Sequence, residues 1–234
     1  DDLKGLADLV RGRNVAVFCD EPYDQMAWTG KHHSLLAEEG MMEHCVAAYT
    51  FSKSYSMSGW RLGFTVSSPA IAQMIAKLTN TALSCVPPFV QLAGVAALQN
   101  DLAERDENMA TFRSKVEFLA GKLNEMADIN CLTPGGSFYV FPDVSAICHR
   151  YNITSHGLAM YLLQAADDNF GVACLGGECF GEAGGGFLRF SCAEPDEKLQ
   201  EALDFLPGAL QNQERIEAFL AANSNYQLAA PYQV

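Results

Sequence analysis

CVAAYTFSKSYSMSGWRLGFTVS, residues 45–67, sets the interpretation of the whole chain. It begins with a short apolar run, residues 45–51, of the kind expected for a strand buried on both faces. It continues through hydroxyls, a lysine and an arginine into a second apolar run, residues 61–67. Another such run, NVAVFC at 14–19, precedes it, and helical patterns follow at 69–79 and 89–99. Strands that alternate with helices predict an α/β layer with a mainly parallel sheet.

The second half of the chain has a different pattern. Residues 102–126 predict a long amphipathic helix with Phe112, Val116, Leu119 and Leu123 on one face. Short strands and two further helices after it predict a smaller α+β unit. We therefore expect part of a large domain over residues 1–101, a small α+β domain over 102–222 and a loose tail over 223–234.

Composition narrows the class of protein. Hydrophobic residues make up 49% and charged residues 18%, which is typical of a globular chain. The net charge of -13 argues against nucleic acid or an anionic membrane as partner, and no apolar run approaches the roughly 20 residues that span a bilayer. The cysteines form no C-x-x-C pair and the histidines show no ligand spacing, so we expect reduced thiols in a cytoplasmic protein and no metal site.

CDEPY, residues 19–23, lies where the first predicted strand ends. Ligands of open α/β sheets bind beyond the carboxyl ends of the strands. A carboxylate that emerges from a buried strand is costly unless it meets a cation or several donors. For Asp20 a protonated pyridine nitrogen is such a cation, and Tyr23 can donate a hydrogen bond to a ring oxygen. A helix cap or a turn built on Asp-Glu-Pro is the alternative, and this segment alone does not decide between them.

The loop after the second predicted strand brings together residues that suit a phosphorylated carbonyl compound. Lys53 follows a buried strand, where a desolvated amine can act as a nucleophile. Arg61 offers a planar fork to a phosphate, and Thr50 and Ser52 add short hydroxyl donors. The alternative is a solvated loop with two surface cations, but such a loop gives no reason for the Trp and Gly around the arginine.

These segments resemble a known family. SKSYSMSGWRLGF at 52–64 is similar to the lysine motif of class I/II aminotransferases, which are pyridoxal phosphate (PLP) enzymes of fold type I, and CDEPY resembles their Asp-x-x-Tyr element. TPGGSFYVFPDV at 133–144 resembles a small-domain segment near the active site, and FLRFSCA at 187–193 resembles the carboxylate-binding arginine motif. The four motifs follow in the family's order over nearly the whole chain, most like bacterial aspartate aminotransferases.

The resemblance implies a cofactor, pyridoxal 5'-phosphate, and a role for each matching residue. Lys53 would hold the cofactor as an internal aldimine and move the proton of the substrate. Asp20 would pair with the pyridine nitrogen, and Tyr23 would hydrogen-bond the ring oxygen. Arg61, with Thr50 and Ser52, would hold the phosphate.

Two further motifs concern the substrate. The resemblance implies that Arg189 grips the substrate α-carboxylate through a bidentate pair. It also implies that Gly135 and Gly136 let the backbone come close to the substrate. An arginine at the rim of the core and an ordinary Pro-Gly-Gly turn are the alternatives.

The implied protein is a PLP-dependent aminotransferase. It would move an amino group from an amino acid, aspartate-like by preference, to a 2-oxo acid such as 2-oxoglutarate, and it would work as a homodimer with active sites between subunits. Three alternatives stay open: another PLP enzyme of fold type I such as a lyase, a non-catalytic aminotransferase-like domain, and an inactive fragment.

The chain also departs from the family. Relatives of this kind carry, on the N-terminal side, a Gly-containing phosphate loop, an aromatic that stacks on the cofactor and an asparagine, and none has a counterpart here. We therefore expect these 234 residues alone to have weak activity or none. LGGE at 175–178 also replaces the Pro-Gly-Ser that usually precedes the Phe-Gly matched by 180–181.

Overall fold

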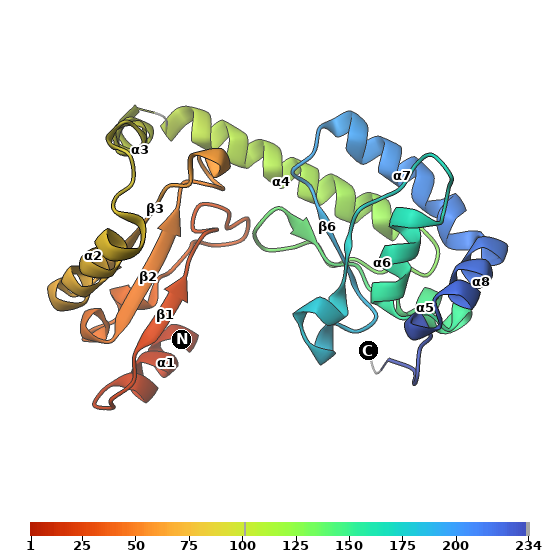
Figure 1. Cartoon of the computed structure of the whole chain (residues 1–234), viewed down its shortest axis with the longest axis horizontal. Helices are drawn as coiled ribbons and strands as arrows, with labels where there is room; N and C mark the ends of the chain where they lie inside the picture. The colour runs from red at the N-terminus through yellow and green to blue at the C-terminus, as the bar shows by residue number, and fades with distance from the viewer. Residues whose placement is uncertain (101, 233–234) are drawn as a thin grey trace. The chain divides into compact units, whose positions relative to one another are not determined.

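A computed structural model describes residues 1–100 and 102–232, which form two compact units (Figure 1). Unit 1 is Asp1–Ala110 and unit 2 is Thr111–Val234. The chain passes from one to the other within helix α4, Leu102–Asn124, whose start was the boundary expected from the sequence. Within the described ranges, no helix has the length and apolar character needed to cross a membrane.

Unit 1 is built on a three-stranded sheet with the order β1-β2-β3. Strand β1 is parallel to β2, as expected, whereas β3 returns antiparallel to β2. In Figure 1 helices α2 and α3 follow the sheet in the chain, and α1 precedes it. The elements in chain order are α1 Asp2–Val10, β1 Val17–Asp20, η1 Leu35–Ala37, η2 Met41–Glu43, β2 Cys45–Thr50, η3 Ser58–Trp60, β3 Gly63–Ser67, α2 Pro69–Leu83 and α3 Pro88–Asn100.

Two apolar clusters hold unit 1 together. The first joins α1 and the two short 3-10 helices to strand β2, and Val17 and Cys19 of β1 pack against it. The second joins the loop after β2 to helix α3. Its members are Phe51, Met57, Leu62, Val90 and Ala97. The loop that carries Lys53 is therefore anchored at both ends by buried side chains.

The expectation that these strands are buried on both faces is wrong for β1 and β3. Burial alternates along β1, so that Val17 and Cys19 face the first cluster while Phe18 is 68% exposed. Most of β3 is exposed as well. Successive side chains of a strand point to opposite faces, and the first cluster covers the face of β1 that carries Val17 and Cys19 while Phe18 points away from it. An apolar run in the sequence does not show whether other elements pack on both faces of the strand.

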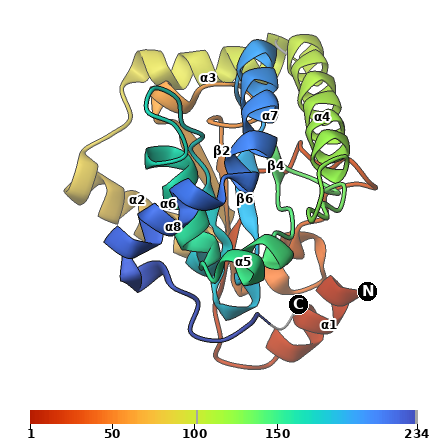
Figure 2. The same cartoon turned by 90° about the vertical axis from the view of Figure 1, so that its right-hand side faces the viewer.

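Unit 2 contains a second three-stranded sheet, ordered β4-β6-β5 and antiparallel throughout. Figure 2 shows α5, α6 and α8 grouped beside it, and α5 contacts both of the other two. Of the face predicted for the long helix, Val116, Leu119 and Leu123 are buried, which confirms that face. The elements after α4 are β4 Tyr139–Val140, α5 Ser145–Tyr151, α6 Ser155–Gln164, β5 Leu175–Gly176, η4 Gly177–Phe180, η5 Glu182–Gly184, β6 Leu188–Ser191, α7 Asp196–Gln211, α8 Gln213–Ala222 and η6 Ser224–Tyr226.

The segment after α8 differs from the loose tail expected from its lack of periodicity. Thr154 N donates to Tyr226 O at 2.8 Å, and Leu228 N donates to Asn152 O at 3.0 Å. Farther along, Tyr232 N donates to Nε2 of His149 at 2.9 Å. Backbone and side-chain hydrogen bonds of this kind need no regular period, so the sequence pattern could not reveal them. Up to Tyr232 the segment belongs to unit 2.

Gly177 is needed for the close approach of two backbones in unit 2. A Cβ atom at this position would lie 1.8 Å from the carbonyl oxygen of Gly184. We expect Gly177→Ala to reduce the free energy of local opening by about 2 kcal/mol or more, since the backbone must move to relieve the clash. Hydrogen exchange of the segment 176–187, followed by mass spectrometry, measures this opening.

Gly121→Ala is the matched control for that change. Gly121 lies in α4, and a Cβ there would have no neighbour within 4 Å. Alanine has the higher helix propensity, so this variant should keep or slightly increase the stability. Equal protection of 176–187 in both variants would contradict the assignment of the Gly177–Gly184 contact.

Candidate functional site

The ends of β1 and β2 lie side by side at one edge of the unit 1 sheet. The two strands are parallel, with Asp20 opposite Ala48, and Glu21 N donates to Ala48 O at 2.9 Å. Thr50 is two residues beyond Ala48 and therefore belongs to the same face as Asp20. The loops that follow both strands consequently start from neighbouring points, which is where α/β sheets bind ligands.

Lys53 and Tyr23 come from these two loops and meet. Lys53 Nζ lies 5.8 Å from the centroid of the Tyr23 ring, and both residues are half-buried. The Lys53 carbonyl accepts from Ser56 N at 3.1 Å, and Met57 N donates to Phe51 O at 3.1 Å. These bonds close a turn, which holds Lys53 near the ring of a residue 30 positions away in the chain.

Of the two acidic residues at the end of β1, Asp20 and Glu21, only Asp20 is left available. The Glu21 carboxylate accepts from Ser34 Oγ at 2.8 Å and lies 2.9 Å from Nε2 of His32. Burial acts to raise the pKa of Glu21, but hydrogen bonds from Tyr49, His32 and Ser34 outweigh it and lower the pKa. The Asp20 side chain is exposed and makes no hydrogen bond or ion pair in the part of the chain that the structure describes.

The three residues predicted to hold a phosphate lie around the end of β2. Thr50 Oγ1 is 2.9 Å from Ser52 Oγ and accepts from Ser52 N at 3.0 Å. Gly63 pairs with Thr50 across the sheet, which places Arg61 beside the same edge. Arg61 is exposed, has a φ of 53°, and donates from Nη1 to Ser58 O at 2.8 Å. Such left-handed backbone at a non-glycine residue is strained and concentrates at functional sites.

Ser54 is a residue of this loop that the sequence analysis missed. Its side chain is 1% exposed, and its Oγ has no hydrogen-bond partner within the described residues. It lines a cavity of about 270 Å³ together with Thr50, Tyr55 and Arg105. A buried hydroxyl without a partner costs about 1–3 kcal/mol, so it points to a polar group that completes the loop. The only signal in the sequence is a hydroxyl residue directly after Lys53.

Arg189 belongs to unit 2, where it occupies the central strand of the second sheet. Leu175 pairs with it on one side, and β4 flanks β6 on the other. Gly135 and Gly136 lie in the segment that leads into β4, three residues or more before Tyr139. Its guanidinium carbon lies 4.2 Å from the centroid of the Tyr139 ring and 4.7 Å from that of Phe180.

The contacts of Arg189 leave its hydrogen-bonding capacity unused. Aromatic faces attract the guanidinium group and fix its plane. In the described residues no carboxylate pairs with it, although it is half-buried. The five N–H donors of an arginine in this state suit a planar anion such as a carboxylate.

Glu178, Ser155 and Tyr232 form a second polar group in unit 2 that the sequence analysis missed. The Glu178 carboxylate accepts from Ser155 Oγ at 2.5 Å and from the hydroxyl of Tyr232. It lies at the N-terminus of α6, which favours negative charge. Burial acts to raise the pKa of Glu178, but these bonds and backbone N–H groups outweigh it and lower the pKa. The sequence signal was the departure from the family's Ser at this position.

The lowered pKa of Glu178 predicts how the stability of unit 2 depends on pH. A carboxyl group whose pKa is lower in the folded state stabilises the fold above its unfolded pKa of about 4.3, and this contribution is lost as pH falls through the folded pKa. Glu178→Gln should therefore be less stable than the wild type at pH 7. The difference should shrink below about pH 4.5. Urea unfolding at pH 7 and in steps down to pH 3.5, read from the protection of α6 amides, measures it.

Glu182→Gln is the control, because it removes one negative charge from the same loop at an exposed position. The difference in free energy of unfolding between Glu178→Gln and wild type should shrink as pH falls from 7 to 4. If it grew instead, the direction of the pKa shift of Glu178 would be wrong.

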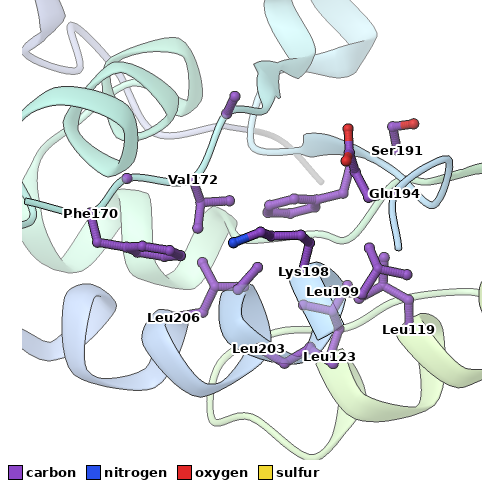
Figure 3. Close-up of a pocket in the computed structure, with 14 residues that line it drawn as sticks. Leu119, Leu123, Phe170, Val172, Ser191, Glu194, Lys198, Leu199, Leu203 and Leu206 are labelled. Atoms are coloured by element: carbon purple, nitrogen blue, oxygen red, sulfur yellow. The ribbon is translucent and has the colours of Figure 1, made fainter. Parts of the chain in front are cut away.

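The cavity in Figure 3 is separate from these residues. It measures about 280 Å³ and lies in unit 2 between α4, α7 and the segment around Phe170. Figure 3 shows Lys198 among Phe170, Val172 and Leu206, and the rest of the lining is mainly apolar. Phe190 and Ser191 line it from the end of β6, whereas Arg189 does not. It contains none of the cofactor-binding or substrate-binding residues predicted from the sequence.

Comparison with known proteins places this geometry in context. Residues 1–206 match the family described as "Aminotransferase class I and II". The chain is 30% identical over 213 residues to an aspartate aminotransferase of Pyrococcus horikoshii, covering 90% of the chain and 52% of the relative. It is 27% identical over 218 residues to aromatic-amino-acid aminotransferase 2 of Thermococcus litoralis, covering 92% of the chain and 54% of the relative.

A solved structure gives the same result for the fold. The aromatic aminotransferase from Pyrococcus horikoshii superposes with a TM-score of 0.77 at 30% identity, over 95% of this chain and 56% of that one. The likeness confirms the α/β fold class expected from the sequence. The chain spans about half the length of the curated relatives that it matches.

Proposed function

Because the chain belongs to the class I and II aminotransferases, fold type I enzymes that use pyridoxal 5'-phosphate, we propose that it is the lysine-bearing part of a PLP-dependent aminotransferase. The observation that carries this proposal is the meeting of Lys53 and Tyr23 beyond the joined ends of two parallel strands. The lysine amine lies 5.8 Å from the centroid of the tyrosine ring, and Asp20 ends the neighbouring strand. No periodic pattern requires an amine, a phenol and a carboxylate at one sheet edge.

The donor set of unit 1 fits this cofactor. PLP, when bound, withdraws electrons from the substrate's α-carbon and carries the amino group between the two halves of the reaction. Asp20 offers the carboxylate that supports a protonated ring nitrogen, and Tyr23 offers a phenol to the ring oxygen. The paired hydroxyls of Thr50 and Ser52 and the exposed fork of Arg61 suit a phosphate. The buried, unpartnered Oγ of Ser54 leaves room for one more polar contact.

Lys53 is the residue that we propose for proton movement. Its amine takes the proton from the α-carbon of the amino acid and later gives one back, which is general acid–base catalysis by a positioned side chain. Anchoring of its loop by Phe51 and Met57, both buried, keeps the amine in one place. Such positioning is worth several kcal/mol of the barrier in enzymes.

Arg189 is the residue that we propose for the substrate α-carboxylate. Its guanidinium group rests against Tyr139 and Phe180, and its N–H donors have no carboxylate partner within the described residues. We propose an aspartate-like amino acid as donor and a 2-oxo acid such as 2-oxoglutarate as acceptor. The aspartate aminotransferase of Pyrococcus horikoshii among the relatives supports this choice.

Transfer of labelled nitrogen tests the proposed reaction. The longer protein of which we propose this chain to be a part is incubated with PLP, ¹⁵N-aspartate and 2-oxoglutarate, and we expect ¹⁵N-glutamate in the mass spectrum. These 234 residues alone should give little or none. The Lys53→Arg variant is the blank for reactions that PLP catalyses alone. Release of ammonia or of a decarboxylated product, without labelled glutamate, would overturn the proposal in favour of a lyase.

We also propose that the protein acts as a homodimer in the cytoplasm. Helices α2 and α3 present large apolar side chains that are at least 65% exposed, and such surfaces mark interfaces. They are Met74, Leu78, Leu83, Phe89 and Leu92. All eight cysteines are free, which suits a reducing compartment. Sedimentation of wild type against Leu78→Glu, which places a charge on this surface, tests the dimer.

A further inference from the structure

The loop between β5 and β6 brings an aromatic ring onto the proposed substrate-binding arginine. It consists of the two 3-10 helices η4 and η5 and ends at Phe187. Phe180, the last residue of η4, lies with its ring centroid 4.7 Å from the guanidinium carbon of Arg189. Phe180 is 50% exposed, so burial of its own side chain contributes little to keeping it there. Its ring also makes an edge contact with Phe141, with the ring centroids 5.9 Å apart. The position of Phe180 therefore depends on this contact and on what holds the rest of the loop.

Glu178, two residues before Phe180 in the same short helix, anchors the loop. Its carboxylate accepts from Ser155 Oγ at 2.5 Å and from the Tyr232 hydroxyl. Ser155 is fully buried and also accepts from Gly186 N at 3.2 Å. Both ends of the loop thus connect to the first residue of α6. Hydrogen bonds to a charged group are about twice as strong as neutral ones.

Tyr232 closes this network from the far end of the chain. Its hydroxyl accepts from Ser155 N at 2.8 Å and donates to Glu178 Oε1. Its ring covers the glycines at the end of the loop: a Cβ added at Gly185 would lie 2.7 Å from a ring carbon. The bond from Tyr232 N to His149 fixes the backbone at the same point. The tyrosine therefore packs on the loop and hydrogen-bonds its anchor.

The two partners of this contact come from distant parts of the chain. Tyr232 lies beyond residues 1–206, the part that matches the family. Glu178 belongs to LGGE at 175–178, which departs from the Pro-Gly-Ser of the motif that this segment resembles. A half-buried carboxylate is costly without donors, and the C-terminal segment supplies one in the Tyr232 hydroxyl.

We infer that Tyr232 and Glu178 are positioning residues that hold Phe180 against Arg189 and thereby set the affinity of the site for a substrate carboxylate. This inference rests on the proposed function, in which Arg189 binds that carboxylate. Neither residue touches the reacting atoms. Loss of the pair should weaken carboxylate binding and leave the proton transfer at Lys53 almost unchanged.

Tyr232→Phe is the primary test, because it removes one hydroxyl and keeps the ring over Gly185. We expect the KM for the amino acid and the Kd for succinate, a simple carboxylate probe measured by calorimetry, to rise about tenfold. The kcat should change by less than about twofold. Hydrogen exchange should speed up in the segment 177–187.

Tyr226→Phe is the matched control. Tyr226 belongs to the same C-terminal segment and stacks on Phe219, but its hydroxyl makes no hydrogen bond within the described residues. This variant should match wild type in KM, Kd and exchange. Equal values for Tyr232→Phe and Tyr226→Phe would overturn the inference.

The variant Glu178→Gln, combined with Tyr232→Phe, tests whether the two residues act together. If the two residues act as a pair, the double variant Tyr232→Phe/Glu178→Gln should have the same affinity for succinate as the single variant with the lower affinity. Additive losses would overturn the pairing.

Binding of succinate also separates this inference from the proposed function. Suppose that the protein transfers no amino group but binds succinate through Arg189, and binds it more weakly after Tyr232→Phe. The positioning role of the pair then holds, and the proposed reaction is wrong. If the protein transfers amino groups and has the same KM in both tyrosine variants, the proposed reaction holds and the positioning role of the pair is wrong.

Discussion

Lys53→Arg is expected to lower the rate of amino-group transfer by about 10²–10⁴-fold, the usual contribution of a positioned acid–base group. Arginine keeps the positive charge and can still lie against the Tyr23 ring, so the fold of the loop should survive. A guanidinium group cannot lose its proton in a protein, however, and it therefore can neither attack the cofactor's aldehyde nor move the α-proton. The initial rate of ¹⁵N transfer from aspartate to glutamate measures the loss.

Lys77→Arg is the control for this change. Lys77 is an exposed residue of α2 and should tolerate the exchange without effect. Equal rates for Lys53→Arg and wild type would remove Lys53 from the mechanism. A comparable loss in both variants would mean that the assay reports a general effect of arginine rather than the chemistry of one amine.

Arg189→Lys is expected to lower kcat/KM for the amino acid about 10- to 100-fold, mainly through KM. Lysine keeps the charge but offers a point charge in place of the planar fork. It also gives up the flat contact with Tyr139 and Phe180, whose rings lie 4.2 Å and 4.7 Å from the guanidinium carbon. Loss of one hydrogen bond to a charged group costs about 1.5–3 kcal/mol. Steady-state kinetics with aspartate and 2-oxoglutarate measure the change.

Two comparisons make the Arg189 result specific. Arg113→Lys exchanges an exposed arginine that pairs with Glu117 on α4, and it should leave the kinetics unchanged. An amine substrate without an α-carboxylate should react equally with wild type and Arg189→Lys. If the variant were impaired toward this amine as strongly as toward aspartate, the loss would lie in the fold and the carboxylate role would be wrong.

The part of unit 1 that could be predicted from sequence is the part governed by local pattern. Apolar runs followed by polar residues predicted β1 and β2, and parallel pairing then brings Asp20 and Lys53 to one edge. The direction of β3 was not predicted, although only 12 residues separate the end of β2 at Thr50 from its start at Gly63. Parallel crossovers generally need a helix, so a connection this short favours an antiparallel return.

The burial of β1 in unit 1 and the hydrogen-bond network of unit 2 could not be predicted, for a different reason. The apolar run around Phe18 was expected to be covered on both faces, yet cover depends on neighbours that a run does not specify. Glu178 and Tyr232 are 54 positions apart and share no motif or period. Their contact follows from the tertiary path of the C-terminal segment. At LGGE, residues 175–178, the sequence showed only a difference from the family's motif. Nothing in the sequence indicated that the Tyr232 hydroxyl donates to Glu178.

The central claim is that Lys53 is the residue that holds PLP, and borohydride reduction tests it most directly. The chain is mixed with PLP and reduced, which fixes the cofactor on any amine that binds it, and peptide mass mapping then locates the label. We predict that the label lies on the peptide with Lys53, at stoichiometric level, and that Lys53→Arg abolishes it while Lys77→Arg does not. A label spread over surface lysines, equal in wild type and Lys53→Arg, would contradict the account.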